Sequence, residues 1–206
     1  MLAMTRLWLA IKAFFQLGPQ KSIHYARYRL AKRIGLYRLL HPLDGREHGN
    51  VGALQAPFNP PSVARYRELY AHNAPALLEE ANAIAAGQVR LFGGHPRSLN
   101  LDPGIDLTHW TDYDSGQFEG QDIKDIWEPA RFGWATTLAR AYALSGDERY
   151  PAAFWDYFEA FNAANPPNRG PNWASAQEVA LRLIAWLFTF TLIAGSEATT
   201  PERKIA

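Results

Sequence analysis

The sequence predicts an all-α protein made of helical hairpins, with a short β and loop segment before the main helices. The first observation is a set of three helical patterns of apolar residues in the second half, near residues 122–145, 148–163 and 174–194. The second is the connection "SGD" between the first two patterns, where Gly146 can end one helix and Asp147 can cap the next. The third is an internal repeat, which predicts how the hairpins are arranged.

The repeat relates "IWEPARFGWATTLARAY" to "SAQEVALRLIAWLFTF", two segments about fifty residues apart. Each holds a Glu, an Arg and a Trp in the same order: Glu128, Arg131 and Trp134 in the first, and Glu178, Arg182 and Trp186 in the second. One further helix separates the two similar helices, which is typical of helical hairpins stacked side by side. Such arrays extend as solenoids or close into α/α toroids.

Charge is distributed unevenly along the 206 residues. Residues 1–43 carry eight of the 21 Lys and Arg and none of the 20 Asp and Glu, so the rest of the chain is acidic. Helical patterns at 4–16 and 21–39, broken by "GPQ", predict a basic helical arm over residues 1–43. The turn-rich stretch 44–61 predicts a linker, and residues 62–206 form the predicted helical body.

A solvated basic helix is the commoner explanation of such an arm, and contact with an anionic membrane surface is the alternative. No motif with interleaved aromatic residues indicates nucleic acid, so we expect no nucleic acid partner. Lys12 interrupts the N-terminal apolar run and no small-x-small cleavage site follows Phe15, which argues against a signal peptide. Arg182 interrupts the longest apolar run of the body, so we also expect no membrane span.

The segment between the linker and the main helices predicts two helices and a long loop. Apolar spacing from Ser62 to Gly87 indicates two helices separated at Pro75. Residues 88–121 are dense in turn formers and predict one or two short strands within a long ordered loop. At the other end of the body, "TTPERKIA" looks like a helix start with Thr200 as its cap, so we expect the polypeptide to be the N-terminal part of a longer protein.

Metal and cofactor sites are not predicted. The acidic run "DYDSGQFEGQDIKDIWE" suggests calcium, but Gly116 falls at a ligand position of an EF-hand and Gln117 at its invariant glycine. The six histidines include no i,i+4 pair, and the absence of cysteine excludes thiolate ligands. The carboxylates of Asp112 and Glu128 leave a glycoside hydrolase on a helical toroid as an alternative enzyme.

Glu178, Arg182 and Trp186 follow one another at intervals of four, so they share one face of a helix. A structural role would use Ser175 and Glu178 as a capping box, Glu178 and Arg182 as an i,i+4 ion pair, and the Trp as core. A functional role would place them in a sugar-binding groove. There a Trp covers the apolar face of a pyranose, and an Arg matches a uronate carboxylate or a sulfate.

Four segments in order, "WEPAR", "SGDERY", "NPPNRGPNW" and "EVALRLIAW", resemble the N-terminal domain of heparinase II/III-type polysaccharide lyases and related alginate lyases. They span about 65 of the 206 residues, and the first 90 match more loosely. The resemblance implies an incomplete α/α toroid followed by a C-terminal β-sandwich. It also implies cleavage of acidic, uronic-acid glycans by β-elimination, in which an Asn or His neutralises the carboxylate and a Tyr or His removes the neighbouring proton.

The family's catalytic Asn-His pair lies beyond "EVALRLIAW", and no such pair follows Trp186, so we assign no catalytic residue. The residues carried over as substrate contacts are Trp127, Glu128, Arg131, Asn172, Trp173, Glu178 and Arg182. The resemblance implies a periplasmic or other extracytoplasmic location and an inactive fragment. The alternatives are a non-catalytic glycan-binding or scaffold protein and the glycoside hydrolase.

Overall fold

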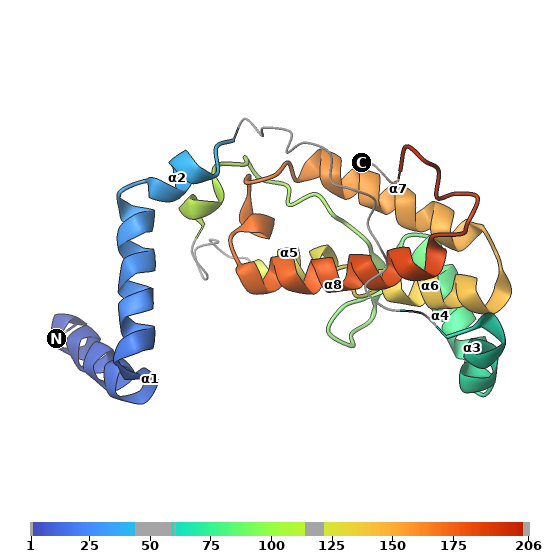
Figure 1. Ribbon diagram of the computed structural model, residues 1–206, viewed down its shortest axis with the longest axis horizontal. Coiled ribbons are helices and arrows are strands. Elements are labelled where there is room, and N and C mark those ends of the chain that lie inside the picture. Colours follow the sequence, from blue (N-terminus) through green and yellow to red (C-terminus); the bar gives the residue numbers. More distant parts are fainter. Residues whose placement is uncertain (1, 44–58, 60, 114–121, 204–206) are drawn as a thin grey trace. The chain divides into compact units, whose positions relative to one another are not determined.

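The computed structural model describes residues 2–43, 59, 61–113 and 122–203. The chain divides into two compact units, Met1–Gly45 and Arg46–Ala206 (Figure 1). Most of the predicted linker and the middle of the acidic run, residues 114–121, lie outside the described residues. The described part is mainly helical, which confirms the all-α class.

The first unit consists of α1 (Leu2–Arg33) and the short α2 (Leu36–Leu40). Gly18 bends α1 into two rods, because its φ of 81° and ψ of 164° are not helical and Pro19 follows it (Figure 1). The predicted break at "GPQ" is therefore confirmed. The predicted second helix is too long, since Gly35 adopts a left-handed conformation and separates α1 from α2.

The second unit begins with two helices and a β-hairpin. Helix α3 (Val63–Tyr70) starts at Ser62, whose Oγ accepts a hydrogen bond from the N–H of Arg65 at 3.3 Å. Helix α4 (Ala74–Ala85) holds Pro75 in its first turn. Strands β1 (Gln88–Arg90) and β2 (Pro96–Ser98) pair antiparallel, with Val89 opposite Arg97. The two predicted helices and the short strands are confirmed.

The main helices are α5 (Ile123–Ala130), α6 (Ala135–Ser145), α7 (Arg149–Ala164) and α8 (Ala176–Ile193). The single helix predicted over 122–145 is wrong, because α5 and α6 are separate. Phe132 lies between them with a φ of 58°, and its side chain is fully buried. Burial of this ring against Phe161 and Trp186 stabilises a backbone conformation that a non-glycine residue rarely adopts.

The hairpin between α6 and α7 forms as predicted. Gly146 ends α6 in a left-handed conformation, and its N–H donates to the carbonyl of Tyr142 at 2.7 Å. The N-cap of α7 is Glu148 rather than the predicted Asp147, whose Oδ1 accepts from the N–H of Arg149 at 3.0 Å from one residue before the cap. Gly146 therefore has the predicted role, and Asp147 bonds to the start of α7 without being its N-cap.

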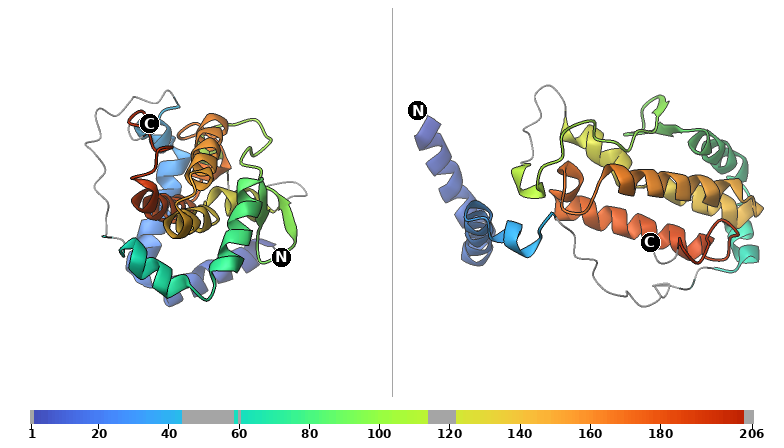
Figure 2. Two further views of the ribbon diagram at one scale, coloured as in Figure 1. Left: turned by 90° about the vertical axis from the view of Figure 1, so that its right-hand side faces the viewer. Right: turned by 90° about the horizontal axis from the view of Figure 1, so that it is seen from above.

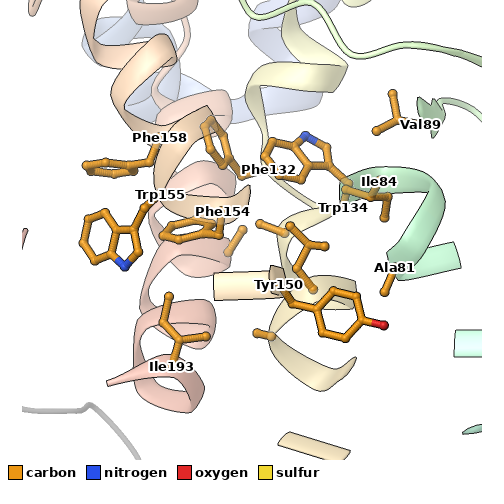
Figure 3. Close-up of a cluster of buried hydrophobic side chains, with 14 of the residues drawn as sticks. Ala81, Ile84, Val89, Phe132, Trp134, Tyr150, Phe154, Trp155, Phe158 and Ile193 are labelled. Atoms are coloured by element: carbon orange, nitrogen blue, oxygen red, sulfur yellow. The ribbon is translucent and has the colours of Figure 1, made fainter. Parts of the chain in front are cut away.

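The core of the second unit lies between α4, α6, α7 and α8 (Figures 2 and 3). Its centre is aromatic: Phe154 on α7 meets Phe190 on α8 edge to face, with ring centroids 5.4 Å apart. Phe158 on α7 and Trp186 on α8 meet in the same manner at 4.9 Å. Helices α6 and α8 pack against each other, so the two segments of the predicted repeat are neighbours.

Helix α8 has two contrasting faces. By length and hydropathy it is the one helix of the described residues that could cross a membrane. Its inner face, however, buries Glu178 and Arg182 within the second unit, and its outer face exposes Leu183 and Ile184. A buried Glu and a buried Arg held by protein groups are typical of the core helix of a folded domain, and we interpret α8 in this way.

Candidate functional site

All seven predicted contact residues lie where α5, the 3-10 turn η2 (Pro171–Trp173) and the first half of α8 meet. Hydrogen bonds, ion pairs and the contact of Arg182 with the ring of Trp173 connect them, and we call the set the junction network: Trp127, Glu128, Arg131, Asn172, Trp173, Glu178 and Arg182. The residues that the sequence analysis selected are therefore close together in space. Whether they contact a ligand stays a prediction.

The loop "NPPNRGPNW" is held in place by a second loop. The N–H of Gly170 donates to the carbonyl of Thr108 at 2.9 Å, and the N–H of Trp110 donates to the carbonyl of Asn168 at 3.0 Å. Gly170 has a φ of 84°, in the left-handed region that glycine favours. Two backbone hydrogen bonds thus connect residues 108–110 of the predicted long loop to the segment that precedes η2.

Asn165, at the end of α7, is a member of this site that the sequence analysis missed. It is buried, and its Nδ2 donates to the carbonyls of Leu101 and Phe161, both at 2.9 Å. Its Oδ1 accepts from Asn172 Nδ2 at 2.8 Å, and its carbonyl accepts from Trp173 Nε1 at 3.3 Å. The signal that could have found it is an Asn directly after a helix and before two prolines, where its amide can donate to a carbonyl of the last helical turn.

Arg131 joins two carboxylates. Its Nε lies 2.5 Å from Glu178 Oε2 and its Nη2 lies 2.9 Å from Glu178 Oε1, while Nη1 donates to Glu128. Glu178 is buried, with an exposed fraction of 3%, whereas the side chains of Arg131 and Glu128 are 28% and 25% exposed. Hydrogen bonding to Glu178 raises the pKa of Arg131 above its ordinary value, with burial acting against it.

The structure contradicts the predicted ion pair between Glu178 and Arg182, and also the capping box at Ser175. Glu178 pairs with Arg131 from α5, and the side chain of Ser175 makes no capping hydrogen bond. The reason is geometric: the Glu178 carboxylate meets the two-pronged guanidinium of a facing element, a better match than an i,i+4 neighbour offers.

Arg182 is 2% exposed and binds backbone carbonyls. Its Nε donates to Ala130 at the end of α5 at 2.6 Å, and its Nη2 donates to Asn172 at 2.9 Å. Its guanidinium lies 4.6 Å from the ring centre of Phe161 and 5.3 Å from that of Trp173. Burial lowers the pKa of Arg182 to about 10, although the negative charge of Glu178 opposes the shift. Arg182 therefore ties α5 and η2 to α8.

The network has a buried half and a partly exposed half. Asn172, Glu178 and Arg182 are buried, which favours a structural role for them. Trp127 and Trp173 are partly exposed, like Arg131 and Glu128. The indole N–H of Trp127 donates to the carbonyl of Pro171 at 2.9 Å, so this Trp offers a ligand its apolar ring surface rather than its donor.

A surface hollow of about 320 Å³ lies beside α5 but outside the network. It is lined by residues 100–104 together with Asp125 and Ile126. Asp102 and Asp125 make it unsuited to an acidic glycan. Among the described residues, no group of three His, Cys, Asp or Glu could hold a metal ion.

Comparison of the chain with protein-family models, with curated proteins and with solved structures finds no match. The resemblance to polysaccharide lyases therefore stays a prediction, and the function is argued from the residues and their geometry.

Proposed function

We propose that this chain is the helical, glycan-binding portion of a polysaccharide lyase that cleaves uronic-acid glycans by β-elimination. The observation that supports it best is the partly exposed half of the junction network, to which Trp127, Trp173 and Arg131 belong. Flat indole surfaces suit the apolar face of a sugar ring, and a guanidinium suits its carboxylate.

The packing of α6, α7 and α8 is consistent with one wall of an α/α toroid. The two similar helices are neighbours, and α7 connects them as the second helix of a hairpin. In a toroid, successive hairpins line a central groove with equivalent side chains. We therefore propose the incomplete toroid as the architecture of the second unit, with the network on its wall.

The reaction needs groups that the network does not supply. In β-elimination a base removes the proton next to the uronate carboxylate, the glycosidic C–O bond breaks, an acid protonates the departing oxygen, and a double bond forms in the sugar. We assign none of these steps to a described residue. The network's part is to bind and orient the acidic chain.

Arg131 must exchange one partner in order to bind a uronate. Its Nε and Nη2 bond to the buried Glu178, which solvent does not reach. Its Nη1 bonds to Glu128, whose side chain is 25% exposed. A uronate carboxylate therefore replaces Glu128, so that Arg131 keeps two carboxylates around it and the fold is left intact.

The test is calorimetric titration of the full chain with oligouronates, with neutral oligosaccharides of equal length as the control. We expect heat of binding with the acidic oligosaccharides only. Ultraviolet absorption at a new double bond would report cleavage, and we expect none from this chain alone because no described residue is assigned a catalytic step. Equal binding of acidic and neutral chains, or no binding of either, contradicts the proposal.

A non-catalytic glycan-binding or scaffold protein is the second candidate, favoured by the burial of Asn172, Glu178 and Arg182. It predicts the same preference for acidic glycans, and it predicts no unsaturated product even from a longer protein of which this chain would be the helical portion. New reducing ends without ultraviolet absorption would instead identify a glycoside hydrolase.

A further inference from the structure

The first unit combines strong positive charge with exposed apolar side chains. Residues 1–43 include eight Lys and Arg and no acid. Arg27, Arg29 and Arg33 on the second rod of α1 are all exposed. The guanidinium groups of these three exposed side chains are available to an anionic partner.

This unit exposes many large apolar side chains to solvent, which a solvated basic helix does not need. Trp8 is 60% exposed, Phe15 is 79% exposed, and Leu39 in α2 is 80% exposed. Ile23 and Leu30 are also exposed. Isolated apolar residues on a surface are common, but this many in one short unit marks an interaction site.

Charge and apolar surface are interleaved along the helix, as Lys12 over the ring of Trp8 illustrates. Ile23 and Leu30 are seven residues apart, two turns, and so share a face of the second rod, as Trp8 and Phe15 do on the first. Arg27 lies within about 60° of both Ile23 and Leu30 around the helix, whereas Arg29 lies roughly 100° from Leu30. An Arg beside exposed apolar residues can lay its aliphatic stem along them and extend its guanidinium to the level of anionic lipid headgroups, as side chains do at the interface of a membrane.

We propose that the first unit, residues 2–43, docks on an anionic lipid bilayer. The apolar side chains enter the boundary between headgroups and acyl chains, and the Lys and Arg side chains bind lipid phosphates. Trp8 suits the headgroup level, where tryptophan is enriched. The bend at Gly18 lets the two rods lie on the surface in different directions.

Two other binding partners of the first unit, a nucleic acid and a second copy of the chain, account for fewer of its exposed side chains. A nucleic acid would meet the positive charge and stack on aromatic rings, but it leaves the aliphatic Ile23, Leu30 and Leu39 in water. A second copy of the chain could offer acidic residues from its second unit, but water-facing carboxylates do not cover apolar side chains. A bilayer satisfies both kinds of side chain at once.

The test is co-sedimentation of the full chain with vesicles of phosphatidylcholine alone and of phosphatidylcholine mixed with phosphatidylglycerol. Binding to the mixed vesicles is expected to exceed binding to the neutral ones and to fall as salt is added. Each Lys or Arg near an anionic surface strengthens binding about fivefold. The variant R27Q/R29Q/R33Q should therefore lose on the order of 100-fold, and glutamine keeps the helix intact.

A second variant tests the apolar contribution. Trp8→Gln with Phe15→Gln should weaken binding to the mixed vesicles at least about tenfold, because two large rings no longer leave water. Two matched controls come from the second unit: R65Q/R90Q removes exposed charge and L183Q/I184Q removes exposed apolar surface. Both controls should stay within about twofold of the unchanged chain.

Several outcomes overturn the proposal. One is equal binding to both kinds of vesicle, and another is full retention of binding by the arginine variant. Tighter binding to duplex DNA than to mixed vesicles would identify nucleic acid as the occupant. A dimer in light scattering that W8Q/F15Q converts to a monomer would identify a second copy.

Discussion

The two Glu-Arg-Trp segments have the same order of side chains but different surroundings. In the first, Glu128 and Arg131 are about a quarter exposed. In the second, Glu178 and Arg182 are buried. The tryptophans also differ, because Trp134 Nε1 donates to the carbonyl of Pro129 at 2.9 Å, whereas Trp186 Nε1 is buried without a hydrogen-bond partner.

Hydrogen bonds between the two segments account for this difference. Arg131 of the first binds Glu178 of the second, and Arg182 of the second binds the carbonyl of Ala130 in the first. The second segment thus provides the buried side chains of Glu178 and Arg182, whereas the first keeps part of its Glu and Arg side chains exposed to solvent. The two copies of the repeat therefore differ in role: the second stabilises the fold, and the first is the one proposed to contact a ligand.

The largest effect is expected from Arg131→Met. This change leaves the carboxylate of Glu178 buried without its partner, and loss of one member of such a pair costs about 3 kcal/mol. Arg131→Met with Glu178→Leu should recover most of that loss, because no buried charge remains. Urea unfolding of the three proteins measures both values. A double variant as unstable as the single one would show that the pair is not the cause.

A smaller loss is expected from Arg182→Met, about 2 kcal/mol. The carbonyls of Ala130 and Asn172 lose their donor, but the cost of burying a charge is also removed. Urea unfolding with Arg90→Met as the matched control checks this value, since Arg90 is exposed and its loss should cost less than about 0.5 kcal/mol. Equal losses in the two variants would contradict the anchoring role of Arg182.

The contributions of Arg182 and Arg131 to stability should depend differently on pH in the alkaline range. The folded-state pKa of Arg182 is lowered to about 10, so this group loses its proton more easily when folded than when unfolded. Its contribution therefore becomes more stabilising as pH rises from about 10 towards the ordinary pKa of an arginine. The pKa of Arg131 is raised, so its contribution is constant below that value and is lost only above it.

Thermal unfolding between about pH 8 and about pH 11 measures this contrast. The stability difference between the unchanged chain and Arg182→Met should grow by about 1 kcal/mol over this range, and the difference for Arg131→Met should stay constant. Comparison with each variant cancels the titration of the buried tyrosines, whose raised pKa values weaken the fold at high pH in all the proteins. Parallel curves for the two variants would contradict the assigned shifts.

The smallest effect is expected from Glu128→Gln. Its side chain competes with a uronate for Arg131 Nη1, so removal of its charge should strengthen binding of oligouronates about threefold. Stability should change by less than about 1 kcal/mol, because the pair is partly exposed. Titration calorimetry measures the affinity. Weaker binding in this variant would mean that Glu128 contacts the sugar directly.

Local features of the fold were predictable, and the distant pairings of the site were not. The end of α6 at Gly146 and the bend at Gly18 depend on neighbouring residues, so residue type sufficed. The partner of Glu178 lies 47 residues away, and no local spacing indicates it. The break at Phe132 also depends on tertiary contacts, since the buried ring stabilises an unfavourable backbone conformation. The sequence pattern selected the seven network residues as one group, but it did not predict which of them are buried and which are partly exposed.

The most direct test is titration of an oligouronate into R131Q/E178Q. This variant removes the guanidinium that is proposed to bind the sugar, and it keeps two hydrogen-bonding side chains in the place of the buried ion pair. With thermal unfolding confirming that the variant is folded, we predict a loss of affinity of at least about tenfold, against no change in Arg90→Gln. Unchanged affinity in a folded R131Q/E178Q would contradict the assignment of the junction network as a glycan-binding site.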